Sequence, residues 1–240
     1  MNNPDRLQLA RERARIRREL RRREVETEAD RYAPWNPVEQ FLVHERKQVA
    51  AELLRRAECL PGPDTRCLEI GFGRCGWLAD LIGWGALETH LHGAEIDLCR
   101  SHVARRRLPA AHLVLADAGR LPWPKGRFDL IILSLVMTSV LDTAVRRRIA
   151  SEVDRVLRPG GALLWYDFAV DNPGNPSVRG IGKEELEALF PRLRGPVRRV
   201  TLAPPLARRI VPRSRALAEI LSTMPFLRTH LLAVLIKPGT

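Results

Sequence analysis

The chain has 240 residues, of which 45% are hydrophobic, and this is enough for one globular domain with a sizeable core. The first thirty residues are charged throughout, and the longest late apolar run covers only residues 231–236, so neither a signal peptide nor a transmembrane helix is indicated. Four cysteines without Cys-x-x-Cys spacing predict reduced thiols and no metal site, and we expect a cytoplasmic protein.

The net charge of +12 is compatible with nucleic acid, anionic lipid or an acidic substrate as a partner. Lysine occurs only at positions 47, 125, 183 and 237, so nearly all basic residues are arginine. Such a skew is also typical of GC-rich coding. The charge therefore does not identify a partner.

Residues 1–36 form a charged N-terminal segment that we expect to be separate from a domain over residues 37–240. Residues 5–31 mix Arg and Glu without Gly or Pro, a pattern typical of an exposed helix with internal ion pairs. The few apolar side chains make only a thin stripe along it. The segment is predicted to be either a solvated helix or a lid over the binding site.

A second helix is predicted from Pro37 to about Ala57. Asn36 is a good N-cap, Pro37 suits the first helical position, and Glu39 has the spacing of a capping box. The turn at residues 61–64 then leads into the first strand.

The chain is organised around a strand that ends in a glycine turn. The apolar run from Cys67 to Ile70 predicts a buried strand, and the glycines are spaced Gly71-x-Gly73-x-x-Gly76 before a helical pattern. Such a turn brings a ligand close to bare backbone and to a helix N-terminus. The pattern alone is shared with dinucleotide-binding folds.

Two acidic residues change this interpretation. Glu69 precedes the turn, where a carboxylate would repel pyrophosphate but suits a ligand with a positive amino group. Glu95 ends a second strand pattern, where an acid can bind both ribose hydroxyls. An amine, a ribose and no phosphate describe S-adenosylmethionine better than NAD.

At this point the sequence resembles the class I S-adenosylmethionine-dependent methyltransferases, from about Pro37 to the C-terminus. The resemblance rests on the order of several pieces, namely Leu68-Glu69-Ile70-Gly71-x-Gly73, Gly93-Ala94-Glu95, Ala116-Asp117-Ala118 with Leu121-Pro122-Trp123-Pro124, Phe128-Asp129-Leu130-Ile131, and Leu157-Arg158-Pro159-Gly160-Gly161. One departure is Cys75, where many members of the family carry a third glycine.

The resemblance implies an α/β fold with a Rossmann-like, mostly parallel sheet of seven strands, helices on both faces and an antiparallel last strand. It also implies S-adenosylmethionine as the cofactor, with Asp117 and the backbone of Ala118 at the adenine. The residues expected to bind the cofactor are Glu69, Gly71, Phe72, Gly73, Glu95, Ile96, Asp117, Ala118 and Ser134.

The strand from Phe128 to Ser134 bears on the acceptor. Family members that methylate an exocyclic base amine carry an Asp-Pro-Pro-Tyr type sequence at its end, and those that methylate C5 of a pyrimidine carry Pro-Cys. Residues 134–137 read Ser-Leu-Val-Met, which disfavours a nucleic-acid acceptor.

Acceptor-side residues are expected in two places. The resemblance favours the aromatic side chains of Tyr32 and Trp35, with packing of a linker as the alternative. The polar loop over residues 171–182 leaves a strand end on the binding side and contributes Asn172 and Arg179. Asp167, just before it, is a weak candidate for a general base.

The C-terminal third carries eight arginines and no acid between residues 192 and 215. A helical insertion is expected over residues 204–226, before a last strand from Thr229 to Ile236. A basic amphipathic helix there could contact a membrane surface, or it could pack on the sheet with its arginines in solvent.

The leading hypothesis is methyl transfer to a small-molecule acceptor, preferably to an oxygen of a metabolite, sugar or lipid-linked intermediate. The alternatives are a methyltransferase acting on RNA or DNA and a non-catalytic cofactor-binding protein. The sequence does not predict an oligomeric state.

Overall fold

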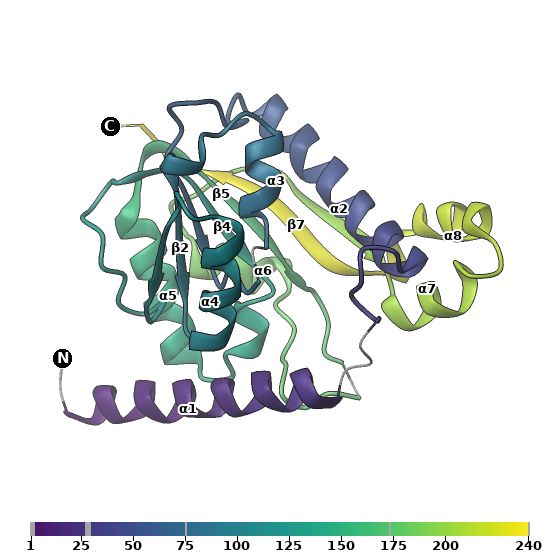
Figure 1. Ribbon diagram of the computed structural model, residues 1–240, viewed down its shortest axis with the longest axis horizontal. Helices are drawn as coiled ribbons and strands as arrows, with labels where there is room; N and C mark the ends of the chain where they lie inside the picture. Colours follow the sequence, from purple (N-terminus) through teal and green to yellow (C-terminus); the bar gives the residue numbers. More distant parts are fainter. Residues whose placement is uncertain (1–2, 27–29, 75, 173, 240) are drawn as a thin grey trace.

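The computed structural model describes residues 3–26, 30–74, 76–172 and 174–239, and these ranges form an α/β fold (Figure 1). Seven strands make one sheet in the order β3-β2-β1-β4-β5-β7-β6. Strands β1 to β5 pair in parallel, and β7 runs antiparallel to both neighbours. The predicted fold class, with its antiparallel last strand, is therefore confirmed. The strands are β1 (Cys67–Ile70), β2 (Leu91–Glu95), β3 (His112–Leu115), β4 (Phe128–Ser134), β5 (Leu157–Phe168), β6 (Val197–Leu202) and β7 (Arg228–Ile236).

Helices cover both faces of the sheet because its central strands are apolar on both sides. One face packs against α2, α3 and α4, and the other packs against α5 and α6. The helices are α1 (Asn3–Glu26), α2 (Pro37–Arg56), α3 (Leu78–Gly83), α4 (Leu98–Arg107), α5 (Thr143–Val156), α6 (Lys183–Leu189), α7 (Pro204–Ile210) and α8 (Arg215–Ser222). The short 3₁₀ helices are η1 (Glu88–His90), η2 (Met137–Ser139) and η3 (Pro225–Leu227).

Local capping explains where two of these helices begin. The side chain of Asn36 accepts from the N–H groups of Val38 and Glu39, as its predicted N-cap role requires. Asp142 caps α5 in the same way, by accepting from Ala144 and Val145.

Residues 158–161, which belong to the last piece of the family pattern, lie within strand β5 and not in a loop before it. Strand β5 begins at Leu157, directly after the helix. The extension forms because the backbone of Gly160 and Gly161 bonds to the backbone of Lys237, after β7.

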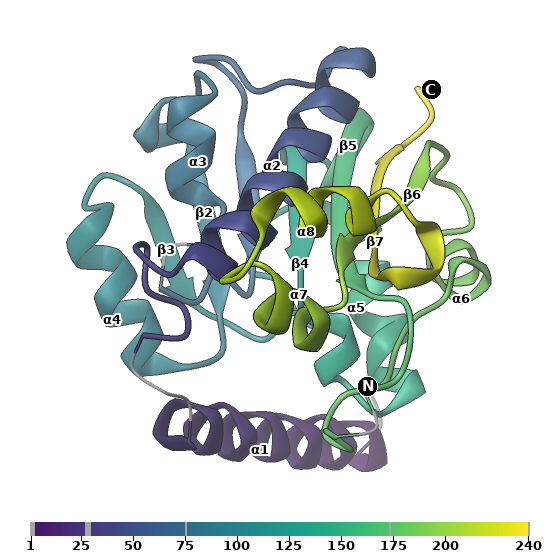
Figure 2. The ribbon, with the colours of Figure 1, turned by 90° about the vertical axis from the view of Figure 1, so that its right-hand side faces the viewer.

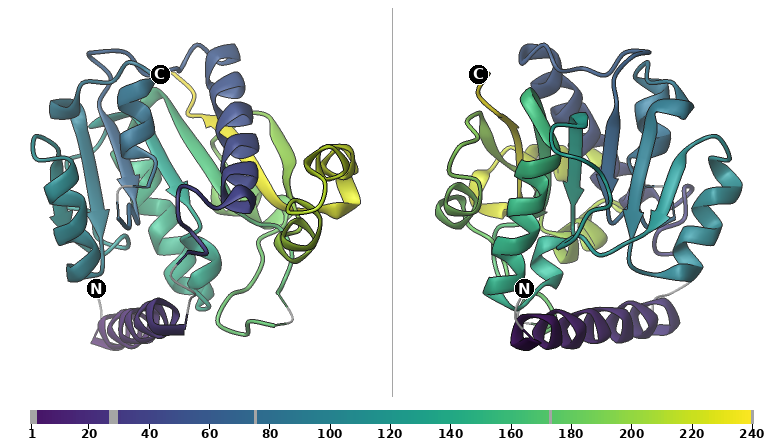
Figure 3. Two further views of the ribbon diagram at one scale, coloured as in Figure 1. Left: turned by 45° about the vertical axis from the view of Figure 1, so that its right-hand side comes forward. Right: turned by 90° about the vertical axis from the view of Figure 1, so that its left-hand side faces the viewer.

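Helix α1 lies across the edge at which the parallel strands end (Figures 1 and 3). Its Leu9 belongs to the main core cluster, and Ile16 packs against that cluster. The interpretation as a solvated helix is therefore wrong for this face, while the predicted ion pairs within the helix are present. Glu12 lies on the same face between Leu9 and Ile16, and it is buried there with its carboxylate accepting from the N–H of Leu141.

Helices α7 and α8 project from the sheet beside β6 and the N-terminal end of α2 (Figure 1), and they lie in front of the sheet in Figure 2. Their inner face packs in a small cluster built on Phe41, Leu202, Ala207 and Ala218. None of the described helices combines the length and the apolar character needed to span a bilayer.

Candidate functional site

The glycine turn after β1 has the backbone that its sequence predicts. Gly71 and Gly73 adopt positive φ values of 74° and 57°. A Cβ atom on Gly71 would lie 2.5 Å from Cγ2 of Val136, so only glycine brings the turn this close to the end of β4. Cys75 lies outside the described residues, and the departure from the family pattern noted there stays open.

Glu69 is buried at the end of β1, and its carboxylate faces the start of α3. It accepts from the backbone N–H groups of Trp77 and Leu78 at 2.9–3.0 Å. Burial raises the pKa of Glu69 to about 7, against the lowering effect of these donors. The carboxylate thus caps α3, and its expected contact with a ligand amine stays a prediction.

Glu95 ties the glycine turn to the end of β2. One carboxylate oxygen accepts from the N–H of Gly73 at 2.9 Å, and the other accepts from the N–H groups of Ile96 and Asp97. A carboxylate has about four acceptor positions, so at least one remains for a ligand hydroxyl.

Asp117 stands at the end of β3 and meets α1. Its Oδ1 accepts from the N–H of Gly119 at 2.8 Å, and its Oδ2 lies 3.5 Å from Nε of Arg13. The predicted adenine residue is therefore in contact with the N-terminal helix.

A cavity of about 750 Å³, counting the part open to solvent, joins these strand ends. Five of the nine predicted cofactor residues line it, namely Gly71, Glu95, Ile96, Asp117 and Ala118. The other four, Glu69, Phe72, Gly73 and Ser134, lie outside its lining. Phe72 is fully buried beneath Gly93, where a Cβ atom would lie 2.4 Å from its ring.

Helix α1 forms the outer wall of this cavity with the apolar side chains of Leu9, Ile16 and Leu20. Polar contacts attach the helix on both sides. Nε of Arg17 donates to the carbonyl oxygen of Ile96 at 3.0 Å, and the N–H of Leu141 donates to Glu12 at 2.7 Å.

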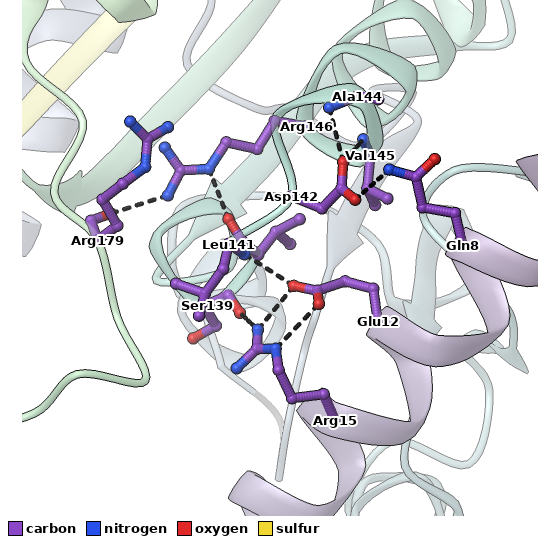
Figure 4. Close-up of polar contacts among 11 residues, drawn as sticks. Gln8, Glu12, Arg15, Ser139, Leu141, Asp142, Ala144, Val145, Arg146 and Arg179 are labelled. Carbon is purple, nitrogen blue, oxygen red and sulfur yellow. Dashed lines mark hydrogen bonds and ion pairs between the residues drawn. The ribbon is translucent and has the colours of Figure 1, made fainter.

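Figure 4 shows the attachment to the loop between β4 and α5. Arg15 forms an ion pair with Glu12 and also donates to the carbonyl oxygen of Ser139, while Gln8 donates to Asp142. Sequence reasoning missed the contacts of α1 with Ser139, Leu141 and Asp142 because they join residues more than a hundred positions apart.

Leu135, which directly follows Ser134 at the end of β4, also lines the cavity. Its φ of 56° is unusual for a leucine, and its N–H donates to the carbonyl oxygen of Tyr166 at 2.8 Å. Backbone strain of this kind is concentrated at functional sites. Val136 and Val140, which follow it, also line the cavity.

Asp167 is buried at the end of β5 and does not line the cavity. It accepts from both the N–H and the hydroxyl of Thr138 and from the N–H of Phe168. Burial raises the pKa of Asp167 to about 6. The carboxylate therefore anchors η2 to the sheet, and its role as a general base stays a prediction.

The four predicted acceptor-side residues do not converge on one point. Asn172 accepts from the N–H of Gly174 and shapes the loop, and Arg179 pairs with Glu185 at 2.6 Å. The same loop is held by fully buried Arg146, which donates to the carbonyl oxygen of Arg179 (Figure 4).

Tyr32 and Trp35 are largely exposed near the N-terminal end of α2. Tyr32 lines a second cavity of about 530 Å³, again counting open space, and Trp35 does not. This cavity is also lined by Leu42 and Glu39 of α2 and by Arg208 of α7.

A buried polar cluster around Arg46 was also missed. The guanidinium carbon of Arg46 lies 5.5 Å from the ring of Trp77 and 5.4 Å from that of Tyr166. His230, whose pKa burial lowers to about 3, stacks on Tyr166. Nε of Arg46 and Nε1 of Trp77 are buried without a hydrogen-bond partner among the described residues.

Neither residue lines the cavity, but Trp77 directly follows the glycine turn and Arg46 lies over its ring, so the two donors fit an anionic group beside the turn, such as the carboxylate of a methionine moiety. Carboxylates at three strand ends and the buried donors of Arg46 and Trp77 together fit an amino acid joined to a nucleoside. Within the described ranges, no three His, Cys, Asp or Glu side chains are arranged to hold a metal ion.

Residues 68–165 match a protein family described as "Methyltransferase domain". A demethylmenaquinone methyltransferase of Mycolicibacterium paratuberculosis is 37% identical over 90 residues, which are 38% of this chain and 36% of that protein. A ubiquinone/menaquinone biosynthesis C-methyltransferase of Vibrio vulnificus is 30% identical over 113 residues, or 45% and 42% of the two chains. The matched region thus spans less than half the length of these curated relatives.

Among solved structures, the geranyl diphosphate C-methyltransferase of Streptomyces coelicolor, bound to S-adenosyl-L-homocysteine, superposes with a TM-score of 0.59. Its identity is 15%, and the match covers 80% of this chain and 77% of that one, so the likeness shows the fold. Residues 68–165 thus carry a methyltransferase domain, and the fold and the carboxylates at the strand ends agree with the class I S-adenosylmethionine-dependent methyltransferases that the sequence resembles.

Proposed function

We propose that this chain transfers a methyl group from S-adenosylmethionine to a small organic acceptor. The proposal rests on one observation: the backbone N–H groups at the glycine turn donate to carboxylates of the chain itself. In a dinucleotide site such N–H groups bind pyrophosphate. Here the N–H of Gly73 donates to Glu95, and those of Trp77 and Leu78 donate to Glu69. Carboxylates in these positions repel a phosphate and suit a cofactor with an amine and a ribose.

The residues that would hold the cofactor follow from this chemistry. Glu95 would accept from the ribose hydroxyls, Asp117 from the adenine amino group, and Arg46 would donate to the methionine carboxylate. S-adenosylmethionine supplies an electrophilic methyl group on a sulfonium. The main task of the chain is then to hold the acceptor in line with that methyl group.

The acceptor we propose has an apolar body and a polar or anionic group. The second cavity combines apolar Leu42, the ring of Tyr32 and the cation of Arg208, which suits such a molecule. Relatives named as C-methyltransferases make carbon as suitable an acceptor atom as the oxygen expected from the sequence.

We also propose that the N-terminal segment over residues 1–36 acts as a lid on the cofactor cavity. Helix α1 covers the cavity with Leu9, Ile16 and Leu20 and is attached mainly through ion pairs and side-chain hydrogen bonds. The contacts of Arg13 and Arg17 are exposed, and such contacts are individually weak, which would let the helix open for exchange of the cofactor.

The test is to incubate the full chain with methyl-labelled S-adenosylmethionine and a panel of phenols, quinols and carboxylic acids. Release of S-adenosylhomocysteine with label in one acceptor is expected, and NMR of the product distinguishes carbon from oxygen. Cofactor binding without turnover would favour a non-catalytic protein, and label in RNA would favour a nucleic-acid methyltransferase. Binding of NAD in place of S-adenosylhomocysteine would contradict the proposal altogether.

A further inference from the structure

The insertion between β6 and β7 presents an apolar and basic outer face, which we call the α7–α8 surface. It consists of Leu217, Ile220, Phe226, Arg208, Arg209, Arg213 and Arg215, all of which are exposed. Because Ala207, Val211 and Ala218 anchor the inner face in a core cluster, the outer residues are held on a packed support.

The apolar side chains of this surface are too exposed to contribute to the core of the protein. Ile220 is 59% exposed and Phe226 is 78% exposed, and Leu217 lies one helical turn before Ile220. The segment before α2, which carries Trp35 with an exposed fraction of 69%, lies at the same end of the molecule as α7 and α8 (Figures 1 and 2). Large apolar side chains gathered at one end indicate an interaction site.

The positive charge of this surface distinguishes between the possible partners. The surface carries four exposed arginines and one acidic residue, Glu219. Glu219 already pairs with Arg215 at 3.1 Å. A second copy joined through the same face would place these arginines against one another, which is unfavourable. Nucleic acid would satisfy the arginines but would leave the aliphatic side chains of Leu217 and Ile220 without apolar partners.

An anionic lipid surface satisfies both parts of the chemistry. Arginine binds lipid phosphates, aromatic side chains favour the interface, and aliphatic side chains enter the acyl region. We propose that the α7–α8 surface docks this chain on an anionic membrane. The cavity between Tyr32, Leu42 and Arg208 then lies beside the bilayer, where an amphipathic molecule could reach it.

The test is co-sedimentation of the full chain with vesicles of phosphatidylglycerol and phosphatidylcholine at about 0.1 M salt. Two variants remove the two parts of the surface, namely Ile220→Ser with Phe226→Ser, and Arg209→Glu with Arg213→Glu. Matched controls are Leu87→Ser with Leu98→Ser, which are comparably exposed, and Arg106→Glu with Lys125→Glu, which change the charge equally. Thermal unfolding checks that every variant is folded.

We expect binding to the anionic vesicles that falls at least tenfold in both surface variants and changes less than twofold in both controls. Brominated lipids should also quench part of the tryptophan fluorescence, and Trp35→Phe should reduce that quenching. Equal losses in the controls, or no binding to anionic vesicles, would overturn the proposal. So would a concentration-dependent dimer that the Ile220 variant abolishes, or RNA binding without vesicle binding. These outcomes do not depend on methyl transfer, so they are separate from a failure of the proposed activity.

Discussion

Nε of Arg13 lies 3.5 Å from Oδ2 of Asp117, so a cation of the N-terminal helix meets the carboxylate proposed to bind the adenine. The contact joins the lid to the cofactor site directly. In the lid that we propose, closing of α1 and binding at Asp117 would therefore be linked.

Replacing Arg13 with Ala should loosen the lid without removing a wall of the cavity. An exposed ion pair contributes about 0–1 kcal/mol, so the dissociation rate of S-adenosylhomocysteine should rise by no more than about fivefold. Stopped-flow fluorescence measures this rate. The control is Arg18→Ala, an exposed arginine of the same helix, which should leave the rate unchanged. Equal rates in the two variants would mean that α1 does not gate the site through this contact.

Changing Asp117 to Ala should weaken binding of S-adenosylhomocysteine by about 1–3 kcal/mol, the scale of a hydrogen bond to a charged group. Glu95→Gln should weaken it similarly, while an amide oxygen can still accept from the N–H of Gly73. Calorimetric titration gives both affinities. Asp171→Ala, which alters a carboxylate of the acceptor-side loop, serves as the control. Unchanged affinity in both site variants would mean that the cofactor does not bind in this cavity.

Asp167 should make the stability of the protein depend on pH. Its pKa is about 6 in the folded chain against an ordinary value of 3.8, because burial disfavours the charged form. Between these values the unfolded chain has already lost the proton that the folded chain keeps, so the free energy of unfolding falls as pH rises. The fall amounts to about 3 kcal/mol and is complete above pH 6. Denaturant unfolding at a series of pH values measures it.

Asp167→Asn should flatten this part of the pH profile, whatever its effect on absolute stability. An unchanged slope would show that Asp167 does not titrate in this range. The same variant tests the predicted general base, because loss of turnover with unchanged cofactor affinity would be the expected result for a residue that acts on the acceptor.

The central strands were predictable because each is a continuous apolar run. Cys67–Ile70 and Phe128–Ser134 have the predicted bounds, and carboxyl ends of parallel strands meet at one edge, which brings Glu95 and Asp117 to the same cavity. The direction of a side chain was not predictable in the same way. Glu69 belongs to the expected motif, yet its carboxylate faces the N–H groups of α3, since that helix start is the nearest set of unpaired donors.

For the N-terminal helix the sequence left two interpretations open, a solvated helix and a lid over the site. The apolar stripe of α1 is thin, and Glu12 is buried only because the N–H of Leu141 and the guanidinium of Arg15 meet it. Both the lid and the cluster around Arg46 depend on long-range pairing of polar groups. Hydrophobic periodicity carries no information about such pairing.

Gly71 and Gly73 offer a matched pair for testing what the glycine turn contributes. Both have positive φ values, so alanine at either position costs about 1–2 kcal/mol of backbone strain. At Gly71 the new methyl group would also lie 2.5 Å from Cγ2 of Val136, whereas nothing lies within 4 Å at Gly73. Gly71→Ala should therefore destabilise the protein more, by a further 1–3 kcal/mol or so for overpacking.

The double variant Gly71→Ala with Val136→Ala separates the two causes. Removing the Val136 methyl groups should recover the overpacking part of the loss, while the strain remains, so the two substitutions should be non-additive in a double-mutant cycle. Val136→Ala combined with Gly73→Ala is the control and should be additive. Denaturant unfolding measures all the variants. Additive losses at Gly71 and Val136 would mean that the turn does not pack against the end of β4, and that the close approach on which the cofactor cavity depends is absent.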